Sequence, residues 1–251
     1  MFSLEEITAF CDERTQRREI VDFPGSHNGL QFANRGEVTK VGAAVDAGLL
    51  PFREAAARGI RFLIVHHGMF WNPFPPVTGV QYEKTRTLLE ADCAVYGAHL
   101  PLDLHPEIGN NVLMAKQLGL EIVDEFLEYE GHAVGKIARA GLSRSELSDR
   151  LRRFYGNTFS AAEYGADRPE RVGILTGSGS SAVGHLKAAG IDTLITGELK
   201  QNFFNQAQEE GLNLYCCGHY ATETHGVRAL AREVAEKFGL DWEFIETECP
   251  W

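Results

Sequence analysis

The stretch Ala57-Arg58-Gly59-Ile60-Arg61-Phe62-Leu63-Ile64 decides the fold, because it joins the end of a helix to a buried strand. Gly59 stands where a helix C-terminal glycine belongs, and the apolar run after it has the length and composition of a strand. The same pattern recurs 131 residues later, in Ala188-Ala189-Gly190-Ile191-Asp192-Thr193-Leu194-Ile195. The chain therefore contains two stretches that predict a helix, a turn and a strand in the same order.

The match between these two parts of the chain extends in both directions. Residues 41–45 align with residues 172–176 at the same spacing of 131, and residues 99–120 align with residues 219–240 at a spacing of 120. The first copy therefore has 11 extra residues, which we place in the loop around residues 71–76. Loops tolerate changes of length, so three matched blocks in the same order indicate duplication followed by divergence.

Each copy predicts strands that alternate with helices, which favours βαβ units and mainly parallel sheets. We therefore expect an α/β fold with two similar lobes, over residues 1–120 and 121–251. The second range begins with a linking segment, in which residues 131–140 have the pattern of a strand. Ser143-Arg144-Ser145-Glu146 then has the capping-box pattern that opens a helix, as Ser3-Leu4-Glu5-Glu6 does near the start of the chain.

Composition limits the class of protein. A chain of 251 residues suits one large or two small domains, and its net charge of −11 argues against broad contact with nucleic-acid phosphates. No segment reaches the roughly 18 consecutive apolar residues of a membrane helix, and the first residues lack a signal-sequence pattern. The five cysteines show neither a disulfide framework nor a zinc-binding pair. We therefore expect a cytoplasmic protein that contacts neither membrane nor nucleic acid.

A His-x-x-x-carboxylate motif occurs twice, each time after a predicted strand. His99 and Asp103 form the first copy, and His219 and Glu223 form the second. Open α/β sheets bind ligands at the carboxyl ends of their strands, and imidazole with carboxylate is a typical ligand set for transition metals. A carboxylate in this position can also be a helix N-cap or a solvated residue, so both interpretations stay open.

His66 and His67 are a further candidate, because they end an apolar run just before Gly68. Adjacent side chains of a regular strand point to opposite faces, so one of them could be a core histidine and the other a surface histidine. At a strand end that turns into a glycine, the backbone can present both to one ligand. The combined motifs favour a site of mixed nitrogen and oxygen ligands, suited to zinc, manganese, iron or cobalt.

Two further residues are candidates for catalysis. Glu198 occupies the position that matches His67, and it could act as a general base, contact a substrate, or simply stabilise the start of a helix. His99 could be a ligand like His219, or it could hold a ligand or a substrate in place, which is what we expect. Residues 176–181, rich in glycine and serine, could cradle an anion, but they lack the Walker pattern.

Several of these motifs occur in an order that resembles the Nif-three-like family of dinuclear metal-centre proteins, often called type-two homologues of GTP cyclohydrolase I. The resemblance covers nearly the whole chain and is closest to the short bacterial branch. Residues 23–27 depart from the usual acidic or aromatic lead-in of the first motif. The motifs are Asn28-Gly29-Leu30-Gln31, Val65-His66-His67-Gly68-Met69-Phe70-Trp71, His99-Leu100-Pro101-Leu102-Asp103, Gly109-Asn110-Asn111, Thr196-Gly197-Glu198 and Gly218-His219-Tyr220-Ala221-Thr222-Glu223.

The resemblance implies two α/β lobes around a di-metal site with two divalent ions per subunit, and a homohexamer built as a trimer of dimers. Carried over by position, it also implies five metal ligands, with Glu223 as the bridge between the ions. These ligands are His66, His67, Asp103, His219 and Glu223.

Two-metal hydrolytic sites hold their ions about 3.5–4 Å apart and activate a water between them. We therefore expect a metal-dependent hydrolase of a small anionic or nucleotide-like substrate, with Glu198 or His99 assisting proton transfer. The resemblance alone implies GTP cyclohydrolase-like activity. The alternatives are a non-catalytic metal-binding protein that regulates or docks a partner, and metals with a purely structural role.

Overall fold

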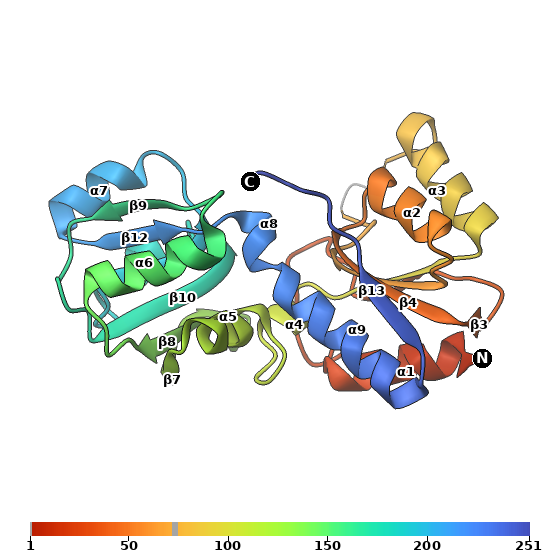
Figure 1. Ribbon diagram of the computed structural model, residues 1–251, viewed down its shortest axis with the longest axis horizontal. Coiled ribbons are helices and arrows are strands. Elements are labelled where there is room, and N and C mark those ends of the chain that lie inside the picture. The colour runs from red at the N-terminus through yellow and green to blue at the C-terminus, as the bar shows by residue number, and fades with distance from the viewer. Residues whose placement is uncertain (1, 72–74) are drawn as a thin grey trace. The chain divides into compact units, whose positions relative to one another are not determined.

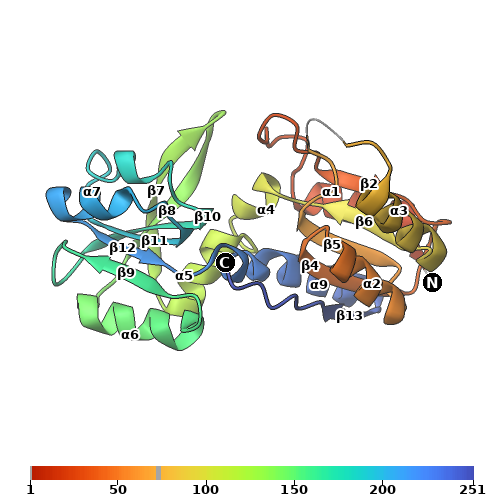
Figure 2. The same cartoon turned by 90° about the horizontal axis from the view of Figure 1, so that it is seen from above.

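The computed structural model describes residues 2–71 and 75–251, which form two compact α/β units. The first unit comprises Met1–Leu102 and Gly226–Glu248, and the second comprises Asp103–His225 and Cys249–Trp251. Each unit is a twisted sheet with helices on both faces (Figures 1 and 2). The predicted fold class, α/β with mainly parallel sheets, is confirmed.

The first unit is built on a five-stranded sheet in the order β13-β4-β5-β6-β2. Four of its strands are parallel and only β2 is antiparallel, at the edge beside β6. The strands are β2 (Gly29–Phe32), β4 (Lys40–Asp46), β5 (Phe62–His67), β6 (Ala94–Gly97) and β13 (Asp241–Phe244). A small separate sheet pairs β1 (Phe2–Ser3) with β3 (Glu37–Val38).

Helices cover the first sheet because its strands are apolar on both sides, as buried parallel strands must be. On one face, Phe52 and Leu88 pack against Leu63 and Val65 of β5. Their helices α2 and α3 lie on the face opposite α1 and α9 (Figure 1). The helices are α1 (Leu4–Arg14), α2 (Leu49–Ala57), α3 (Gly79–Ala91), α4 (Leu100–Asp103) and α9 (Thr224–Phe238).

The second unit is built on a six-stranded sheet in the order β7-β8-β10-β11-β12-β9. Only β10, β11 and β12 are parallel to one another. The strands are β7 (Glu121–Tyr129), β8 (His132–Arg139), β9 (Ser160–Glu163), β10 (Arg171–Ser178), β11 (Thr193–Glu198) and β12 (Asn213–Cys216). The helices are α5 (Asn110–Leu118), α6 (Arg144–Tyr155), η1 (Val183–His185), α7 (Phe203–Glu210) and α8 (His219–Thr222).

The two sheets share an arrangement that agrees with the repeat in the sequence. In each, three parallel strands are followed by an antiparallel edge strand, which gives β4-β5-β6-β2 and β10-β11-β12-β9. The predicted extra length of the first copy lies partly in a helix, because α3 has 13 residues and α7 has 8. Of the loop to which we assigned it, residues 72–74 lie outside the described residues.

The units divide the chain at other positions than the expected boundary at residue 120. The last strand, β13, pairs with β4 in the first sheet, and residues 226–248 belong to the first unit. The expected linking strand, β8, is a regular member of the second sheet and pairs with β10. A local pattern predicts that a strand forms, but the sheet it joins depends on long-range packing.

Local signals in the sequence are confirmed where they can be checked. The Ser3 hydroxyl accepts a hydrogen bond from the Glu6 amide at 3.1 Å, and the Glu6 carboxylate accepts one from the Ser3 amide at 3.1 Å. Ser143 and Glu146 form the same capping box. The predicted cap glycine Gly59, its counterpart Gly190 and three further glycines that follow helices have φ between 60° and 67°, the left-handed region that glycine adopts without strain. They are Gly59, Gly119, Gly190, Gly211 and Gly239.

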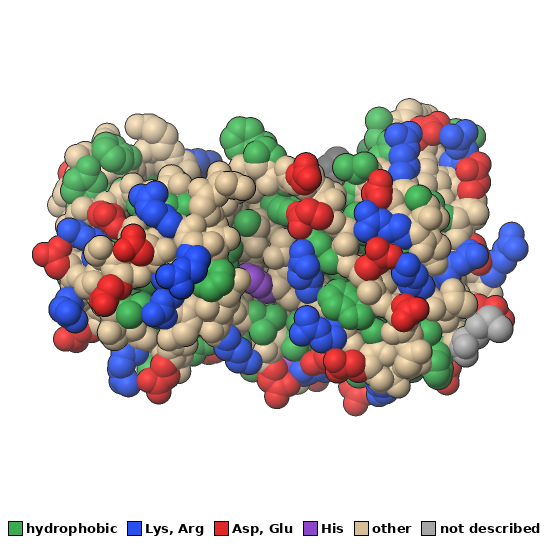
Figure 3. Space-filling model, viewed as in Figure 1, with side chains coloured by type: hydrophobic (Ala, Val, Ile, Leu, Met, Phe, Trp, Pro, Cys, Tyr) green, Lys and Arg blue, Asp and Glu red, His purple; other side chains and the backbone are tan. Residues whose placement is uncertain are grey.

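Charged side chains of both signs lie on the surface. Basic side chains lie among acidic ones on the face that Figure 3 draws, so no broad patch of one sign covers that face. None of the described helices is both long enough and apolar enough to span a membrane.

Candidate metal centre

Three histidines of the first unit come together at the carboxyl ends of β5 and β6. His66 and His67 are the last two residues of β5, and His99 follows β6 just before α4. The ring centroid of His66 lies 4.9 Å from those of both His67 and His99. One ring nitrogen from each lies within 4.8 Å of the others, so the three side chains could hold a metal ion. At this strand end, both adjacent histidines therefore lie in the same group of potential metal ligands.

Each of these three rings is held at Nδ1 by an oxygen atom. A carbonyl or a carboxylate can only accept a hydrogen bond, so Nδ1 must be the donor, and in the neutral ring Nε2 keeps its lone pair. Histidines that bind metals typically have this support at the nitrogen that does not ligate. The pairs are His66 with the Ala98 carbonyl at 2.9 Å, His67 with Asp46 at 2.8 Å and His99 with Asp22 at 2.8 Å.

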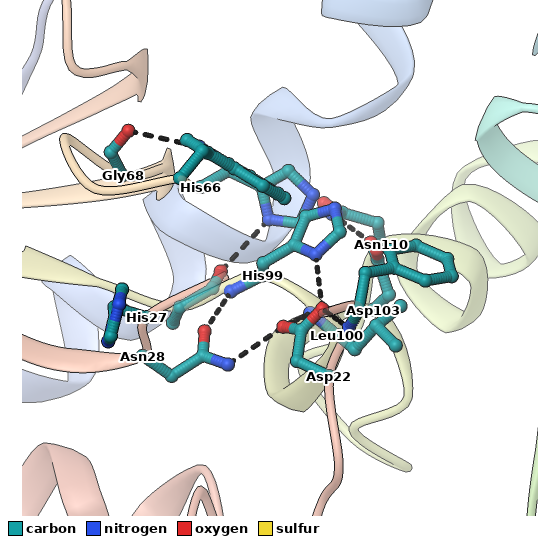
Figure 4. Close-up of polar contacts among 12 residues, drawn as sticks. Asp22, His27, Asn28, His66, Gly68, His99, Leu100, Asp103 and Asn110 are labelled. Carbon is teal, nitrogen blue, oxygen red and sulfur yellow. Dashed lines mark hydrogen bonds and ion pairs between the residues drawn. The ribbon is translucent and has the colours of Figure 1, made fainter. Parts of the chain in front are cut away.

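Asp22 is the centre of a buried network that our reading of the sequence missed (Figure 4). Its carboxylate accepts hydrogen bonds from the His99 ring, from the Asn28 amide at 2.7 Å and from the Leu100 backbone at 3.0 Å. The Asn28 side-chain oxygen in turn accepts from the His99 backbone amide at 2.8 Å. Burial alone would raise the pKa of Asp22, but hydrogen bonds from His99, Asn28 and Phe23 hold it below its usual value. Asp22 is thus a charged anchor for His99.

Replacing Asp22 with alanine should destabilise the protein, because it leaves several buried donors without an acceptor. Each unsatisfied buried donor costs about 1–3 kcal/mol, so we expect a loss of roughly 2–4 kcal/mol in the free energy of unfolding. Urea unfolding followed by circular dichroism measures this loss. Asp22→Asn keeps an oxygen acceptor and should lose less than Asp22→Ala. Equal stability of Asp22→Ala and the wild type would contradict the network.

The motif Asn28-Gly29-Leu30-Gln31 has a second structural role, through Gln31 of β2. The Gln31 side chain accepts a hydrogen bond from the Met69 amide at 2.6 Å and donates to the His27 carbonyl. The side-chain amide of Gln31 lies close to two glycines. A Cβ would come within 2.1 Å of it at Gly68 and within 2.4 Å of it at Gly97. Gln31 therefore holds the segment that follows His67 against β6.

Aromatic side chains surround His99. The ring of Trp71 lies edge-on to it at 5.2 Å, and the ring of Phe23 lies 5.7 Å away. The Trp71 indole N–H donates to the Gly68 carbonyl at 3.2 Å, which fixes its position. The side chain of His99 is only 12% exposed. These contacts suit either a metal ligand or a residue that contacts a flat substrate.

In the second unit, His219 lies between two carboxylates. Its Nε2 is 3.1 Å from the Glu223 carboxylate and its Nδ1 is 3.1 Å from that of Glu198. The Glu223 side chain is 4% exposed and that of Glu198 is 52% exposed. The hydrogen bond with Glu223 raises the pKa of His219 to about 9 despite its burial. A metal ion at Nε2 would have to displace the proton that this carboxylate stabilises.

The structure thus brings the predicted catalytic residue Glu198 to a predicted metal ligand. Glu198 is the last residue of β11, as His67 is the last residue of β5. It holds the Nδ1 of His219 as Asp46 holds that of His67. The same support by an oxygen atom therefore occurs in both units.

Asp103, the last residue of α4, is positioned by the start of α5. The Asn110 side chain donates to the Asp103 carboxylate at 2.7 Å (Figure 4). The neighbouring Asn111 accepts from the Thr176 amide at 2.8 Å and donates to the Val134 carbonyl at 3.0 Å. Both asparagines are fully buried. This explains the motif Gly109-Asn110-Asn111: one asparagine orients a candidate ligand and the other ties α5 to the sheet.

Glycines allow the backbone of the second unit to approach the site closely. A Cβ on Gly177 would come 2.2 Å from the Glu223 carboxylate, and one on Gly197 would come 2.7 Å from the His219 Cα. The Gly177 amide donates to the Thr222 hydroxyl at 3.0 Å, and the amide of Gly179 donates to the Glu198 carbonyl. These two amides are therefore bound within the protein, and Gly177 and Gly179 allow close packing around the site.

All five predicted ligands, and His99 as well, belong to groups of His, Asp and Glu side chains that could hold a metal ion. The donor set fits a divalent cation of the first transition series, because it joins imidazole nitrogens to carboxylate oxygens. His99 thus becomes a candidate ligand beside the five.

The chain is similar to a known protein family over nearly its whole length. The family described as Duf34/NIF3 (NGG1p interacting factor 3) matches residues 3–250. A Deinococcus radiodurans protein named GTP cyclohydrolase 1 type 2 homolog is 38% identical over 222 residues, which is 88% of this chain and 84% of that protein.

Two solved structures are similar over almost the full length of both chains. TTHA1606 from Thermus thermophilus has a TM-score of 0.88 at 36% identity and covers 99% of each chain. Protein ybgI, described as of unknown function, has a TM-score of 0.91 at 32% identity and covers 100% of each chain. The family match, the identities and the shared fold together show that this chain belongs to the Duf34/NIF3 family.

Proposed function

We propose that the protein is a dinuclear metal-dependent hydrolase of a small anionic or nucleotide-like molecule. The observation that carries the proposal is the support of four histidine rings at Nδ1 by oxygen atoms, which leaves Nε2 as the ligating atom. The proposed ligands are His66 and His67 of the first unit and Asp103, His219 and Glu223 of the second.

The surroundings of each residue suggest its role in the proposed site. Glu223 is buried and suits a bridge between two cations, and Asn110 orients Asp103. Bound divalent cations would supply an activated water and Lewis-acid polarisation of the substrate. Glu198 and His99 are our candidates for proton transfer, because each lies beside a proposed ligand.

The substrate class follows from charge and shape. Bound cations dominate the local charge, so an anion can enter a protein whose net charge is −11. Trp71 and Phe23 beside His99 offer flat apolar surfaces to a ring. Relatives bear the name GTP cyclohydrolase 1 type 2 homolog, which makes GTP the first compound to test.

The test measures metal content and hydrolysis on the same samples. Mass spectrometry of the purified protein should find two transition-metal ions per chain, and incubation with GTP, phosphoesters, cyclic amides and peptides should show metal-dependent turnover. Asp103→Asn should lose both metal and turnover. Full activity of Asp103→Asn would overturn the proposal. Tight metal binding without turnover of any compound would favour the regulatory or partner-docking alternative.

Replacing Asp46 with alanine should weaken metal binding without unfolding the protein. Asp46 holds Nδ1 of His67 at 2.8 Å, and loss of such support typically costs about 10–100-fold in metal affinity or activity. Its side chain is 48% exposed, so little stability should be lost. Competition with a fluorescent chelator measures the affinity. An unchanged affinity would remove His67 from the ligand set.

We further propose, on the family resemblance, that the chain forms a homohexamer built as a trimer of dimers. Light scattering coupled to gel filtration should then give a mass six times that of the 27.8 kDa chain. A monomer or a simple dimer at micromolar concentration would contradict it.

A further inference from the structure

A basic groove lies in the second unit, separate from the residues of the candidate metal centre. It is an open groove with a volume of about 540 Å³, within the usual size range of small-molecule sites. Three arginines from three segments line it: Arg139 at the end of β8, Arg168 in the loop before β10, and Arg171 at the start of β10. One carboxylate, Glu170, lines it as well. The chain has 24 basic and 35 acidic residues, so its composition does not account for a groove lined by three arginines and one carboxylate.

Two of these arginines are direct neighbours across antiparallel strands. Arg139 and Arg171 are paired Cα partners of β8 and β10, so their side chains leave the same face of the sheet. Like charges directly opposite each other destabilise a sheet. Two acidic neighbours, Glu121 across from Arg139 and Asp124 beside Arg171, offset part of this cost, and a bound anion would offset more of it.

The carboxylates nearby neutralise this charge only in part. Arg171 donates to Asp124 at 2.9 Å, but its Nε is buried without a hydrogen-bond partner among the described residues. Arg139 contacts Glu121 at 3.3 Å, and both side chains are about two-thirds exposed, where an ion pair contributes little. Arg168 is exposed and makes no hydrogen bond or close ion pair among the residues that the structure describes, although its charge helps to lower the pKa of the Glu146 carboxyl.

The remaining wall of the groove is apolar. Val123 of β7, Leu142 and Pro169 line it beside the arginines. Guanidinium groups bind phosphate oxygens in pairs, and an apolar wall can take a ring or a sugar face. A groove of this volume exceeds the needs of a single inorganic phosphate.

We propose that this groove binds a small phosphorylated organic molecule, such as a nucleoside phosphate, through Arg139, Arg168 and Arg171. The proposal is independent of the metal centre, because none of the groove residues is a proposed ligand. The molecule would bind there whether or not the protein hydrolyses anything.

Calorimetric titration of the full-length, metal-stripped protein with ATP tests this proposal, with EDTA present to exclude binding through a metal. Arg168→Gln and Arg139→Gln should each raise the Kd of ATP about tenfold, as expected for the loss of one charged contact. Glu170→Gln should lower the Kd, because it removes the one carboxylate of the groove. If these residues had only a structural role, the arginine variants and Glu170→Gln would not change the Kd in opposite directions.

The matched control is Arg153→Gln, which removes the same charge from an exposed position on α6 of the same unit. It should leave the Kd within about twofold, since a distant exposed charge is screened by salt. Thermal melts check folding, and Arg168→Gln should melt like the wild type because that side chain has no hydrogen bond or ion pair to lose.

Three results would overturn the proposal: no binding of ATP, equal binding by the wild type and both arginine variants, or equal weakening by Arg153→Gln. Pyrophosphate serves as the second probe. Tighter binding of ATP than of pyrophosphate would support contact between the nucleoside and the apolar wall. Equal binding of the two would overturn the proposed contact with that wall.

Discussion

Replacing Glu223 with glutamine should remove most of the bound metal and all metal-dependent turnover. Glu223 is 3% exposed, and its carboxylate lies 3.1 Å from the Nε2 of His219. Glutamine keeps the shape but removes the negative charge that a buried pair of cations requires. Loss of a residue that merely supports a ligand costs about 10–100-fold in metal affinity, so loss of the proposed bridging ligand should cost at least about 100-fold.

The measurement is metal content per chain after dialysis, together with the rate of hydrolysis. Glu223→Gln should lower the content below one ion per chain. Glu209→Gln, at an exposed position on α7, is the control and should retain all metal. Retention of both ions by Glu223→Gln would show that this carboxylate is not a ligand.

Adding a methyl group at Gly177 or Gly197 should damage both the fold and the site. At Gly177 the φ of +68° adds strain of about 1–3 kcal/mol for any other residue. Its new Cβ would also lie 2.2 Å from the Glu223 carboxylate. At Gly197 the nearest atoms belong to backbone, the Gly177 carbonyl at 2.5 Å and the His219 Cα at 2.7 Å, which cannot rotate away.

We therefore expect Gly197→Ala to lose about 3 kcal/mol of stability or more, and Gly177→Ala to lose a similar amount together with metal affinity. At 2–4 °C per kcal/mol, this corresponds to a fall in Tm of roughly 10 °C. Gly184→Ala is the matched control, because a Cβ there meets no atom within 4 Å. Thermal melts of the three variants compare them directly. A Gly197→Ala protein as stable as Gly184→Ala would contradict the close approach.

The positions of the candidate ligands were predictable because each lies in a short contiguous pattern. An apolar run ending in His66-His67 predicts a strand end, and the His-x-x-x-carboxylate motif predicts the turn after a strand. The structure confirms these positions, at the ends of β5, β6 and β12. The alternation of side chains along a strand and the glycine that ends a helix both depend on only a few neighbouring residues. A single sequence is therefore enough to recognise them.

The residues that support the candidate ligands were not predictable in this way. Asp46 and Asp22 are separated from the histidines they hold by 21 and 77 residues. No periodicity connects such distant positions, and a lone aspartate before a loop has no distinctive local signal. Asn28 likewise has no evident role until β2 and β6 pair and bring it to the backbone of His99.

The sequence by itself determined the α/β class, the cap and turn positions, and the side chains that can bind a metal. These depend on local periodicity and on side-chain chemistry, which are properties of short segments. Only the tertiary structure decided which sheet β13 joins, which nitrogen of each histidine is held, and that three arginines converge on one groove. The physical reason is that such contacts join segments far apart in the chain. Their formation depends on the sum of many small packing and hydrogen-bond energies over the whole unit.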